Sequence, residues 1–335
     1  MTSTLAVLDV GHGSSSVLMS CGKTVVIDTA DRTHLLHYLE CKGIEEIDMI
    51  IISHTDSDHV GGLINILANP KYVIKHLVLN CDSKKQSKLW GDVRTLVDDL
   101  MSRGAITVSM GVSASQAYGW ANVSDEVSIE IVSPTPLMAL TGAGSALPNS
   151  GKALTSNSIS IVARILFKGS PVALITADMD RLALDEMLRS DSAVESKYLI
   201  FPHHGGLPGG DDPASFTKDL LSVVRPDAII FSNGRGRHGT PRAEIIDAVK
   251  VCLPTAKIAC TQLAVKCCEK PLSRDDFKPF VYSAGAGNHS FCAGTIEIDL
   301  ETGLADNRML QAHSSFVSGL PSSLCTIPVV LIPAI

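Results

Sequence analysis

Short, wholly apolar runs alternate with amphipathic stretches along the chain. Runs such as MIII at residues 49–52 have no polar face, which is typical of strands buried on both sides. Strands are predicted at residues 4–10, 23–28, 48–53, 75–80, 105–110, 127–132, 158–167, 172–178, 198–202 and 227–232. Apolar side chains at helical spacing predict helices at residues 33–42, 61–69, 91–103, 180–189 and 213–223, and from about 241 onward.

Glycine, proline and serine mark where these elements end. The first two strands are separated by a predicted turn at Gly11–Ser16, and KGSP at residues 168–171 predicts a hairpin between two later strands. The Gly/Ser/Ala-rich residues 139–153 predict a long loop. Because both sides of that loop carry parts of one candidate site, we expect a single domain over residues 1–335, with a C-terminal extension from about residue 263.

The composition is that of a globular protein with a large core. Of the 335 residues, 45% are hydrophobic and 19% charged, and the mean hydropathy is +0.23. The net charge of −7 argues against binding nucleic acid by bulk charge alone, although bound metal ions would supply local positive charge. No apolar run reaches the roughly 18 residues of a membrane helix. The N-terminus lacks a basic signal segment, so the nine cysteines predict reduced thiols in a cytoplasmic protein without a membrane partner.

The densest chemical signal is SHTDSDHVGG at residues 53–62. It places His54, Asp56, Asp58 and His59 within six residues, directly after a buried strand. In an extended segment His54 and Asp56 point to the same side, and the next two residues follow once the chain turns. The alternative is a polar surface loop that is rich in Asp and His by chance. The spacing favours metal ligation.

This loop resembles the His-x-His-x-Asp-His loop of the metallo-β-lactamase superfamily. With Asp at the second ligand position, it is most similar to the hydrolase domain of ComEC-type DNA-uptake proteins. Four other stretches resemble that domain in the same order: LDVGHGSSSVL at 8–18, VVIDTA at 25–30, TSNSISIVARILFKGSPVALITADM at 155–179 and LIFPHHGG at 199–206. The resemblance covers residues 4–262. It implies an α/β fold, the αββα four-layer sandwich, with the site at one edge between the two sheets.

The resemblance also implies a set of ligands for two divalent ions. His54 and Asp56 would hold one ion, and the second would be held by Asp58, His59 and His203. Asp178 would bridge the ions, with Asp28 orienting the ligand loop from behind. Two ions sharing a carboxylate activate a water for hydrolysis, a reaction in which Asp58 also counts as catalytic. Because Asp56 replaces an imidazole, the oxygen-rich shell favours Mn²⁺ as well as Zn²⁺.

The sequence departs from the family pattern in two places near this set. No histidine occurs between His76 and His203, so the family's third-motif ligand has no counterpart. Asn157 lies near that position and is predicted to bind substrate instead. Ala177 stands where the family has a glycine before the bridging aspartate.

Other polar residues follow the later strands. His204 is predicted to be catalytic or to contact substrate, the alternative being that it only packs. Arg235 and Arg237 lie in a glycine-rich loop and are predicted to bind phosphate, with His238 as proton donor to the leaving group. The alternative is a solvated basic loop. Asp9 and His12 either line the floor of the site or only stabilise a turn.

Two further clusters have less specific signals. Lysines 84, 85 and 88 are predicted to be a solvated face. A group near the C-terminus could hold a structural zinc ion or be simply buried: Cys260, Cys267, Cys268, His289 and Cys292.

The sequence therefore predicts a metal-dependent hydrolase, and specifically a phosphodiesterase or nuclease that acts on nucleic acid or nucleotides with protein partners encoded elsewhere. One alternative keeps the fold and changes the bond, to a thioester, lactone or β-lactam. The other is a non-catalytic, metal-binding regulatory module.

Overall fold

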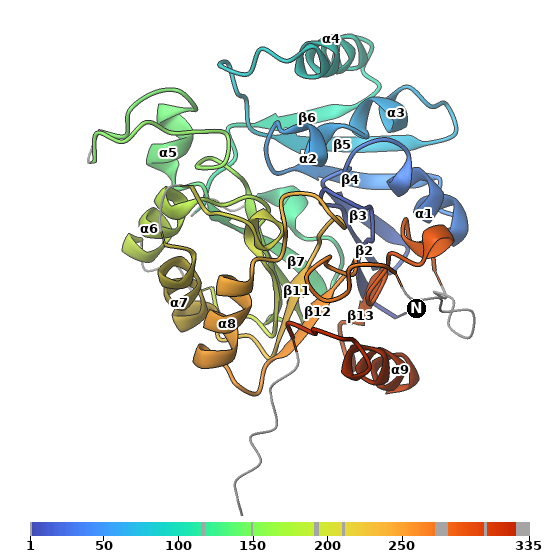
Figure 1. Ribbon diagram of the computed structural model, residues 1–335. Coiled ribbons are helices and arrows are strands. Elements are labelled where there is room, and N and C mark those ends of the chain that lie inside the picture. The colour runs from blue at the N-terminus through green and yellow to red at the C-terminus, as the bar shows by residue number, and fades with distance from the viewer. Residues whose placement is uncertain are drawn as a thin grey trace, which may run out of the picture.

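Two β-sheets face each other at the centre of the molecule (Figure 1). The computed structural model describes residues 2–114, 118–148, 150–190, 194–209, 212–271, 281–304 and 307–325. In that part of the chain the first sheet has the strand order β14-β13-β1-β2-β3-β4-β5-β6. The second sheet has the order β12-β11-β10-β9-β8-β7.

The strands of the first sheet are β1 (Thr4–Val7), β2 (Ser16–Ser20), β3 (Lys23–Ile27), β4 (Glu46–Ile52), β5 (Val73–Leu79), β6 (Thr107–Met110), β13 (Ile296–Asp299) and β14 (Gly303–Leu304). Those of the second are β7 (Val127–Ser133), β8 (Val162–Phe167), β9 (Ser170–Ile175), β10 (Tyr198–Ile200), β11 (Ala228–Phe231) and β12 (Lys257–Cys260). Both sheets are mixed. β3 to β6 run parallel, as do β9 to β12, and the remaining neighbours pair antiparallel.

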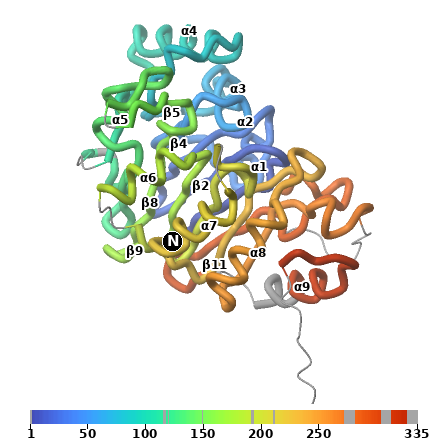
Figure 2. The backbone as a smooth tube through the Cα atoms, turned by 60° about the vertical axis from the view of Figure 1, so that its left-hand side comes forward, coloured from blue at the N-terminus to red at the C-terminus, as the bar shows by residue number. Residues whose placement is uncertain are grey.

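Helices cover the outer face of each sheet. The first sheet is covered by α1 (His34–Lys42), α2 (Ser57–Val60), α3 (Leu63–Leu67) and α4 (Lys88–Ser102). The second is covered by α5 (Pro136–Thr141), α6 (Arg181–Arg189), α7 (Pro213–Val224) and α8 (Ala243–Cys252), with α9 (Asn307–Ser318) at its lower end. In Figure 2, α7 and α8 lie side by side. Short 3₁₀ turns occur at η1 (Gly119–Ala121), η2 (Pro202–Gly205) and η3 (Ala286–Asn288). The predicted αββα sandwich is confirmed.

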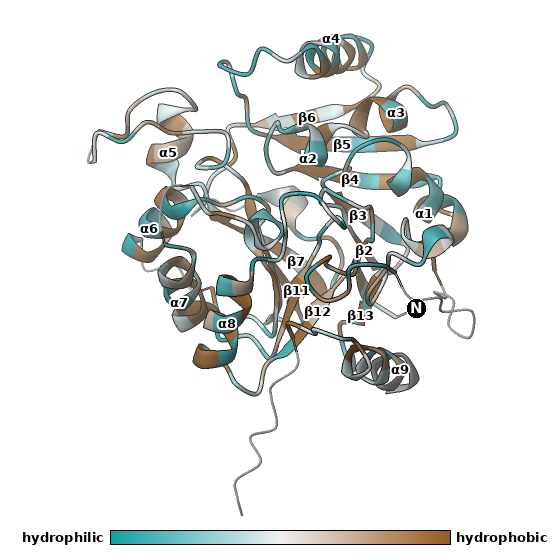
Figure 3. Ribbon diagram, in the orientation of Figure 1, coloured by the Kyte–Doolittle hydropathy of each residue, from teal (hydrophilic) through white to brown (hydrophobic). Residues whose placement is uncertain are grey.

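Three apolar cores hold these layers together. The central core lies between the sheets and includes Leu18, Ile51 and Ile165, all with no exposed surface. Two outer cores lie between each sheet and its helices. The hydrophobic colours of Figure 3 accordingly gather on the strands, while the helices carry hydrophilic colours on their outward parts. Among the described residues, no helix combines the length and the apolar character needed to cross a lipid bilayer.

The sequence missed several short elements. No strand was predicted between residues 11 and 22, but the structure has β2 there. β2 pairs with β1 on one side and β3 on the other. Cys21 and Gly22 both have positive φ, which is the geometry of a two-residue hairpin turn between β2 and β3. The segment after 263, expected as an extension, contributes β13, which pairs with β1 and enlarges the first sheet.

The parallel strands place their carboxyl ends at one edge of the sandwich. The loops after β3 and β4 come from one sheet, and those after β9, β10 and β11 come from the other. A backbone bond from Ile161 N–H to the Ser53 carbonyl (2.9 Å) joins the two sheets at this edge. The polar segments found in the sequence therefore meet there.

We expect Ile165→Ala to lower the free energy of unfolding by about 2–5 kcal/mol, because it leaves a cavity in the central core. The control is Val73→Ala on β5, whose residue is 57% exposed and should change stability by less than about 0.5 kcal/mol. Urea unfolding followed by circular dichroism measures both. Equal losses in the two variants would contradict the described core.

Candidate metal centre

The ligand loop is shaped by the helix that follows β4. Asp56 precedes α2, and its carboxylate makes no capping bond to that helix, so it is available for other partners. Gly61 and Gly62 lie against the turn after β3. A Cβ atom at Gly62 would approach the Thr29 carbonyl oxygen to 2.5 Å, so a larger residue would force the loop away.

The carboxylate of Asp178 lies at the centre of the site. Its Oδ1 is 3.2 Å from Nε2 of His59 and 3.7 Å from Nε2 of His204. Its Oδ2 is 3.5 Å from Nδ1 of His203 and 4.0 Å from Nε2 of His54. Each carboxylate oxygen therefore faces two imidazoles, and Asp178 divides the candidate ligands into two groups.

The first group consists of Asp58, His59, His204 and Asp178. One ligand atom from each lies within 4.8 Å of the others, and Asp58 Oδ2 is 3.3 Å from His204 Nε2. In the second group, Nε2 of His54 is 3.8 Å from Oδ2 of Asp56 and shares Asp178 with His203.

This grouping differs from the one that the resemblance implied. We expected His203 beside Asp58 and His59, with His204 outside the ligand set. In the structure His204 takes that place, and His203 lies on the side of His54, where the third-motif histidine was missing. The two adjacent histidines reach opposite oxygens because both have positive φ, 52° and 57°, so the backbone turns sharply between them.

Buried hydrogen bonds orient the imidazoles. Asp28 accepts bonds from the Ser53 N–H (2.7 Å), the Ser53 hydroxyl (2.8 Å) and Nδ1 of His59 (2.7 Å). Nδ1 of His204 donates to the Ser232 carbonyl (2.7 Å). Because Nδ1 carries a proton in both rings, Nε2, which faces Asp178, is the nitrogen whose lone pair is available to a metal ion. Asp28 thus holds Ser53 and His59 in place, and its role in orienting metal ligands stays a prediction.

The polar atoms left at the centre fit divalent metal ions. In the described structure, buried atoms without a hydrogen-bond partner include Nε2 of His54, His59, His203 and His204 and Oδ1 of Asp178. A buried polar atom without a partner costs about 1–3 kcal/mol. Imidazole nitrogens and carboxylate oxygens are the donors that Mn²⁺ and Zn²⁺ accept, so cations would satisfy these atoms together.

The charges agree with this interpretation. Burial, with a smaller contribution from His59, lowers the pKa of His54 to about 4, so this ring is neutral at physiological pH and can bind metal. Burial also disfavours the charged form of His59, but Asp178 and Asp28 outweigh it and raise its pKa well above the usual range. Without a cation the carboxylates therefore hold a proton on His59, and a metal ion competes with that proton.

His12 belongs to the site, which the sequence left undecided. Its Nε2 is 3.1 Å from Oδ2 of Asp58, and its ring lies between those of His204 and His238, with centroids 4.9 and 4.8 Å away. His12 and His238 both line a cavity of about 370 Å³ with Asp58 and Asp178. His238 thus lies one ring away from a candidate metal ligand.

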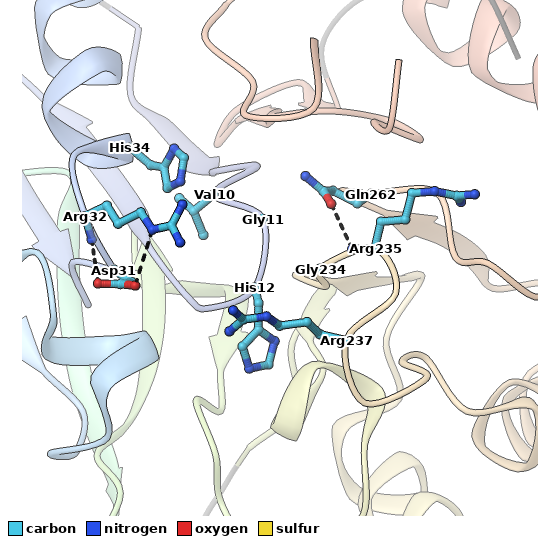
Figure 4. Close-up of a pocket in the computed structure, with 10 residues that line it drawn as sticks. All are labelled: Val10, Gly11, His12, Asp31, Arg32, His34, Gly234, Arg235, Arg237 and Gln262. Atoms are coloured by element: carbon cyan, nitrogen blue, oxygen red, sulfur yellow. Dashed lines mark hydrogen bonds and ion pairs between the residues drawn. The ribbon is translucent and has the colours of Figure 1, made fainter. Parts of the chain in front are cut away.

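The other predicted substrate residues fall in different places. Arg237 extends toward His12 (Figure 4). Arg235 points away, and its guanidinium donates to the carbonyls of Leu263, Cys268 and Glu269 (2.7–2.8 Å). That placement corrects the prediction for Arg235, because its donors are used to hold the C-terminal segment. Asn157 lies in the turn before β8, where its carbonyl accepts from the Ser160 N–H, and it does not line the cavity that contains Asp58 and Asp178.

Sequence reasoning also missed Lys85, which was grouped with a solvated lysine cluster. Its ammonium group contacts Oδ1 of Asp56, leaving Oδ2 facing His54. Asp82 positions this lysine, since its carboxylate accepts the Lys85 N–H (3.1 Å) and the hydroxyls of Thr55 and Ser156. The sequence does show Asp-Ser-Lys-Lys at residues 82–85, two residues beyond β5 and so near the edge of the sheet that carries the ligand loop.

Asp9 is outside the metal centre. It accepts bonds from the Gly11 and Gly285 N–H groups, Gln262 and Ser283, so it fastens the C-terminal segment beneath the site.

Of the predicted zinc ligands, the four cysteines are buried in one outer core, and Cys292 Sγ is 3.3 Å from Nε2 of His313. Among the described residues, the group of potential ligand atoms that lie close together is the one around Asp178. A structural zinc ion at the cysteines therefore stays a prediction.

Ala177, which departs from the family's glycine, adopts a backbone conformation that glycine usually takes. Its φ is 46°, a left-handed conformation in which glycine is usual. Ala177 is buried, and its carbonyl accepts the His203 N–H, so the contact holds it in place.

Comparison with known proteins gives two sequence matches. Residues 6–105 match the family model described as "Anti-Pycsar protein Apyc1". The chain is 25% identical over 236 residues to Recombination protein 2 of Haemophilus influenzae, which covers 68% of this chain and 24% of that protein. The chain thus spans about a quarter of the length of this curated relative.

Solved structures are also similar to the chain. Igni18, a metallo hydrolase from the archaeon Ignicoccus hospitalis, has a TM-score of 0.44 and 17% identity, covering 77% of this chain and 94% of its own. The metallo-β-lactamase fold protein YhfI from Bacillus subtilis has a TM-score of 0.47 and 10% identity, with 78% and 96% covered.

We expect Asp28→Asn to weaken metal binding by about 10–100-fold, because the amide no longer fixes the His59 tautomer. Titration of the metal-loaded protein with a competing chelator measures the affinity. The control is Asp48→Asn on β4, a carboxylate that pairs with Lys23 and Lys75 far from the centre. If Asp28→Asn and Asp48→Asn had the same affinity for metal, the role given to Asp28 would be contradicted.

Proposed function

We propose that the protein is a metal-dependent phosphodiesterase that hydrolyses nucleic acid or nucleotides. The observation that carries the proposal is the single carboxylate, Asp178, whose two oxygens face separate groups of imidazole and carboxylate donors. That arrangement suits two ions that share one bridging ligand, as in two-metal hydrolysis. The ions would be Mn²⁺ or Zn²⁺.

The chain offers each ion a set of donors. Asp58, His59 and His204 would hold one with Oδ1 of Asp178, while His54, Asp56 and His203 would hold the other with Oδ2. When bound, such ions lower the pKa of a water molecule and stabilise negative charge on the reacting phosphate. Asp28 and Ser232 keep the rings of His59 and His204 in the tautomer that donates a lone pair.

Residues around the cavity favour a phosphate over a neutral acyl group. His238 and Arg242 line the same cavity as the candidate ligands, and Arg237, from the same loop after β11 as His238, extends toward His12. Arg237 would contact a substrate phosphate, since a guanidinium matches phosphate oxygens in charge and geometry. His238 would donate a proton to the leaving oxygen.

The curated relative agrees with a nucleic-acid substrate, because its name assigns it to recombination. We place the activity in the cytoplasm, since all nine cysteines are free thiols. Protein partners encoded elsewhere would deliver the substrate. Two alternative functions would replace this proposal if the tests below favour them: a thioester, lactone or β-lactam hydrolase, and a regulatory module.

With Mn²⁺ or Zn²⁺ we expect turnover of bis-p-nitrophenyl phosphate and none of nitrocefin, because Arg237, His238 and Arg242 favour a phosphodiester. Asp58→Ala should abolish this turnover and retain the circular dichroism spectrum of the wild type. Hydrolysis of nitrocefin alone would support the acyl hydrolase. Less than about one metal ion per chain, with no rise in melting temperature on adding metal, would support a regulatory module whose metal site is degenerate.

We expect His238→Ala to lower kcat for a dinucleotide by about 10²–10⁴-fold, the usual contribution of a general acid. Bis-p-nitrophenyl phosphate should lose much less, because p-nitrophenolate leaves without a proton. His37→Ala, an exposed histidine on α1, is the control. Equal losses for both substrates would show that His238 only supports the cavity.

A further inference from the structure

A second cavity lies on the other side of His12 from the metal centre. Its volume is about 190 Å³, and three segments enclose it: residues 10–12 after β1, 31–34 at the start of α1, and 234–237 after β11. His12 lines both this cavity and the one that contains Asp58 and Asp178. Figure 4 shows the three segments meeting around Gly11 and His12.

Close packing fixes the walls of this cavity. Gly234 lies against His12, where a Cβ atom would come within 2.6–2.7 Å of the His12 N and Cα atoms. Gln262 joins the opposite walls, since its Nε2 donates to Asp9 (3.0 Å) and its Oε1 accepts the Arg235 N–H (2.8 Å). The cavity is therefore a built feature of the fold.

The walls carry an excess of positive charge. In Figure 4, Arg32 and Arg237 reach toward the cavity from opposite walls. Arg237 forms no ion pair within the described residues. Arg32 has a weak one: its Nε lies 3.7 Å from the carboxylate of Asp31, and both side chains are more than half exposed. An exposed pair of this kind contributes little, so Arg32 remains able to bind an anion. This concentration of positive charge stands out in a chain of net charge −7.

His34 adds a neutral hydrogen-bonding group to the cavity. Its Nδ1 is 2.6 Å from the Tyr282 hydroxyl, which orients the ring. Burial, more than the surrounding charges, lowers the pKa of His34, so the ring is uncharged at neutral pH. The cavity therefore offers two guanidinium groups and a neutral imidazole to an anion.

We propose that this cavity binds a second phosphate of the substrate, next to the phosphodiester that is cleaved at the metal centre. The inference rests on the proposed function and names its substrate class as nucleotides with at least two phosphates, such as oligonucleotides with a terminal phosphate. A ligand pocket for a whole drug-sized molecule measures about 300–1,000 Å³, so this smaller cavity suits one group of a larger substrate. Because His12 lines both cavities, a substrate that spans it places adjacent phosphates on its two sides.

The test compares thymidine dinucleotides that differ by one terminal phosphate: TpT, pTpT and TpTp. For the wild type with Mn²⁺, we expect kcat/KM for one of the phosphorylated forms to exceed that for TpT by about tenfold or more, as one charge-assisted hydrogen bond can contribute. Arg32→Ala should lower this ratio toward one. Arg103→Ala, which removes a cation paired with Asp99 at the end of α4, is the matched control and should leave the ratio unchanged.

Three results are distinguishable. Cleavage of TpT and bis-p-nitrophenyl phosphate without preference for a terminal phosphate overturns the second phosphate site and leaves the proposed function intact. A preference that survives in Arg32→Ala also overturns this site. If neither bis-p-nitrophenyl phosphate nor any dinucleotide is cleaved, the proposed function itself fails.

Discussion

The site depends on a buried carboxylate, Asp178, whose negative charge needs positively charged or hydrogen-bonding partners at both oxygens. Asp178 lies in the interior of the edge where the sheets meet, and burial by itself would favour its neutral form. His59 and His204 instead hold its pKa well below the usual range. Four imidazoles around one carboxylate leave several nitrogens without a partner. The donor atoms that compensate Asp178 are therefore the same atoms that fit divalent ions.

The fold supplies these donors through strand ends that lie far apart in the chain. β3 and β4 bring Asp28 and the ligand loop from one sheet, while β9 and β10 bring Asp178 and the histidine pair from the other. Several residues next to these ends have positive φ without being glycine, including Asp28, Ala177 and His203. Such conformations cost of the order of 1–3 kcal/mol each, and the surrounding hydrogen bonds hold them. The backbone is thus bent where side chains must be directed.

The C-terminal segment completes the fold and one wall of the site. β13 extends the first sheet beside β1, and Asp9 binds Ser283 and the Gly285 N–H from this segment. Arg235 holds the chain at Cys268 and Glu269. As a result, the loop after β11 is fixed from behind, with Gln262 between it and Asp9. Arg237 and His238 extend from that fixed loop toward the two cavities.

The sequence by itself determined the fold class, the longer strands and helices, and most of the residues that gather around Asp178. Continuous apolar runs and helical spacing predict the longer strands and helices. The αββα sandwich and the grouping of distant residues around Asp178 were implied by the resemblance of five motifs to a known family. It missed β2 and β13, which are too short to carry a clear pattern. Only the tertiary structure decided which histidine of the pair 203–204 faces which oxygen, that the Arg235 guanidinium binds backbone carbonyls, and that His12 and Lys85 contact the candidate ligands Asp58 and Asp56. These outcomes depend on backbone turns and on contacts between strands of different sheets, and neither is set by residues that are neighbours in sequence.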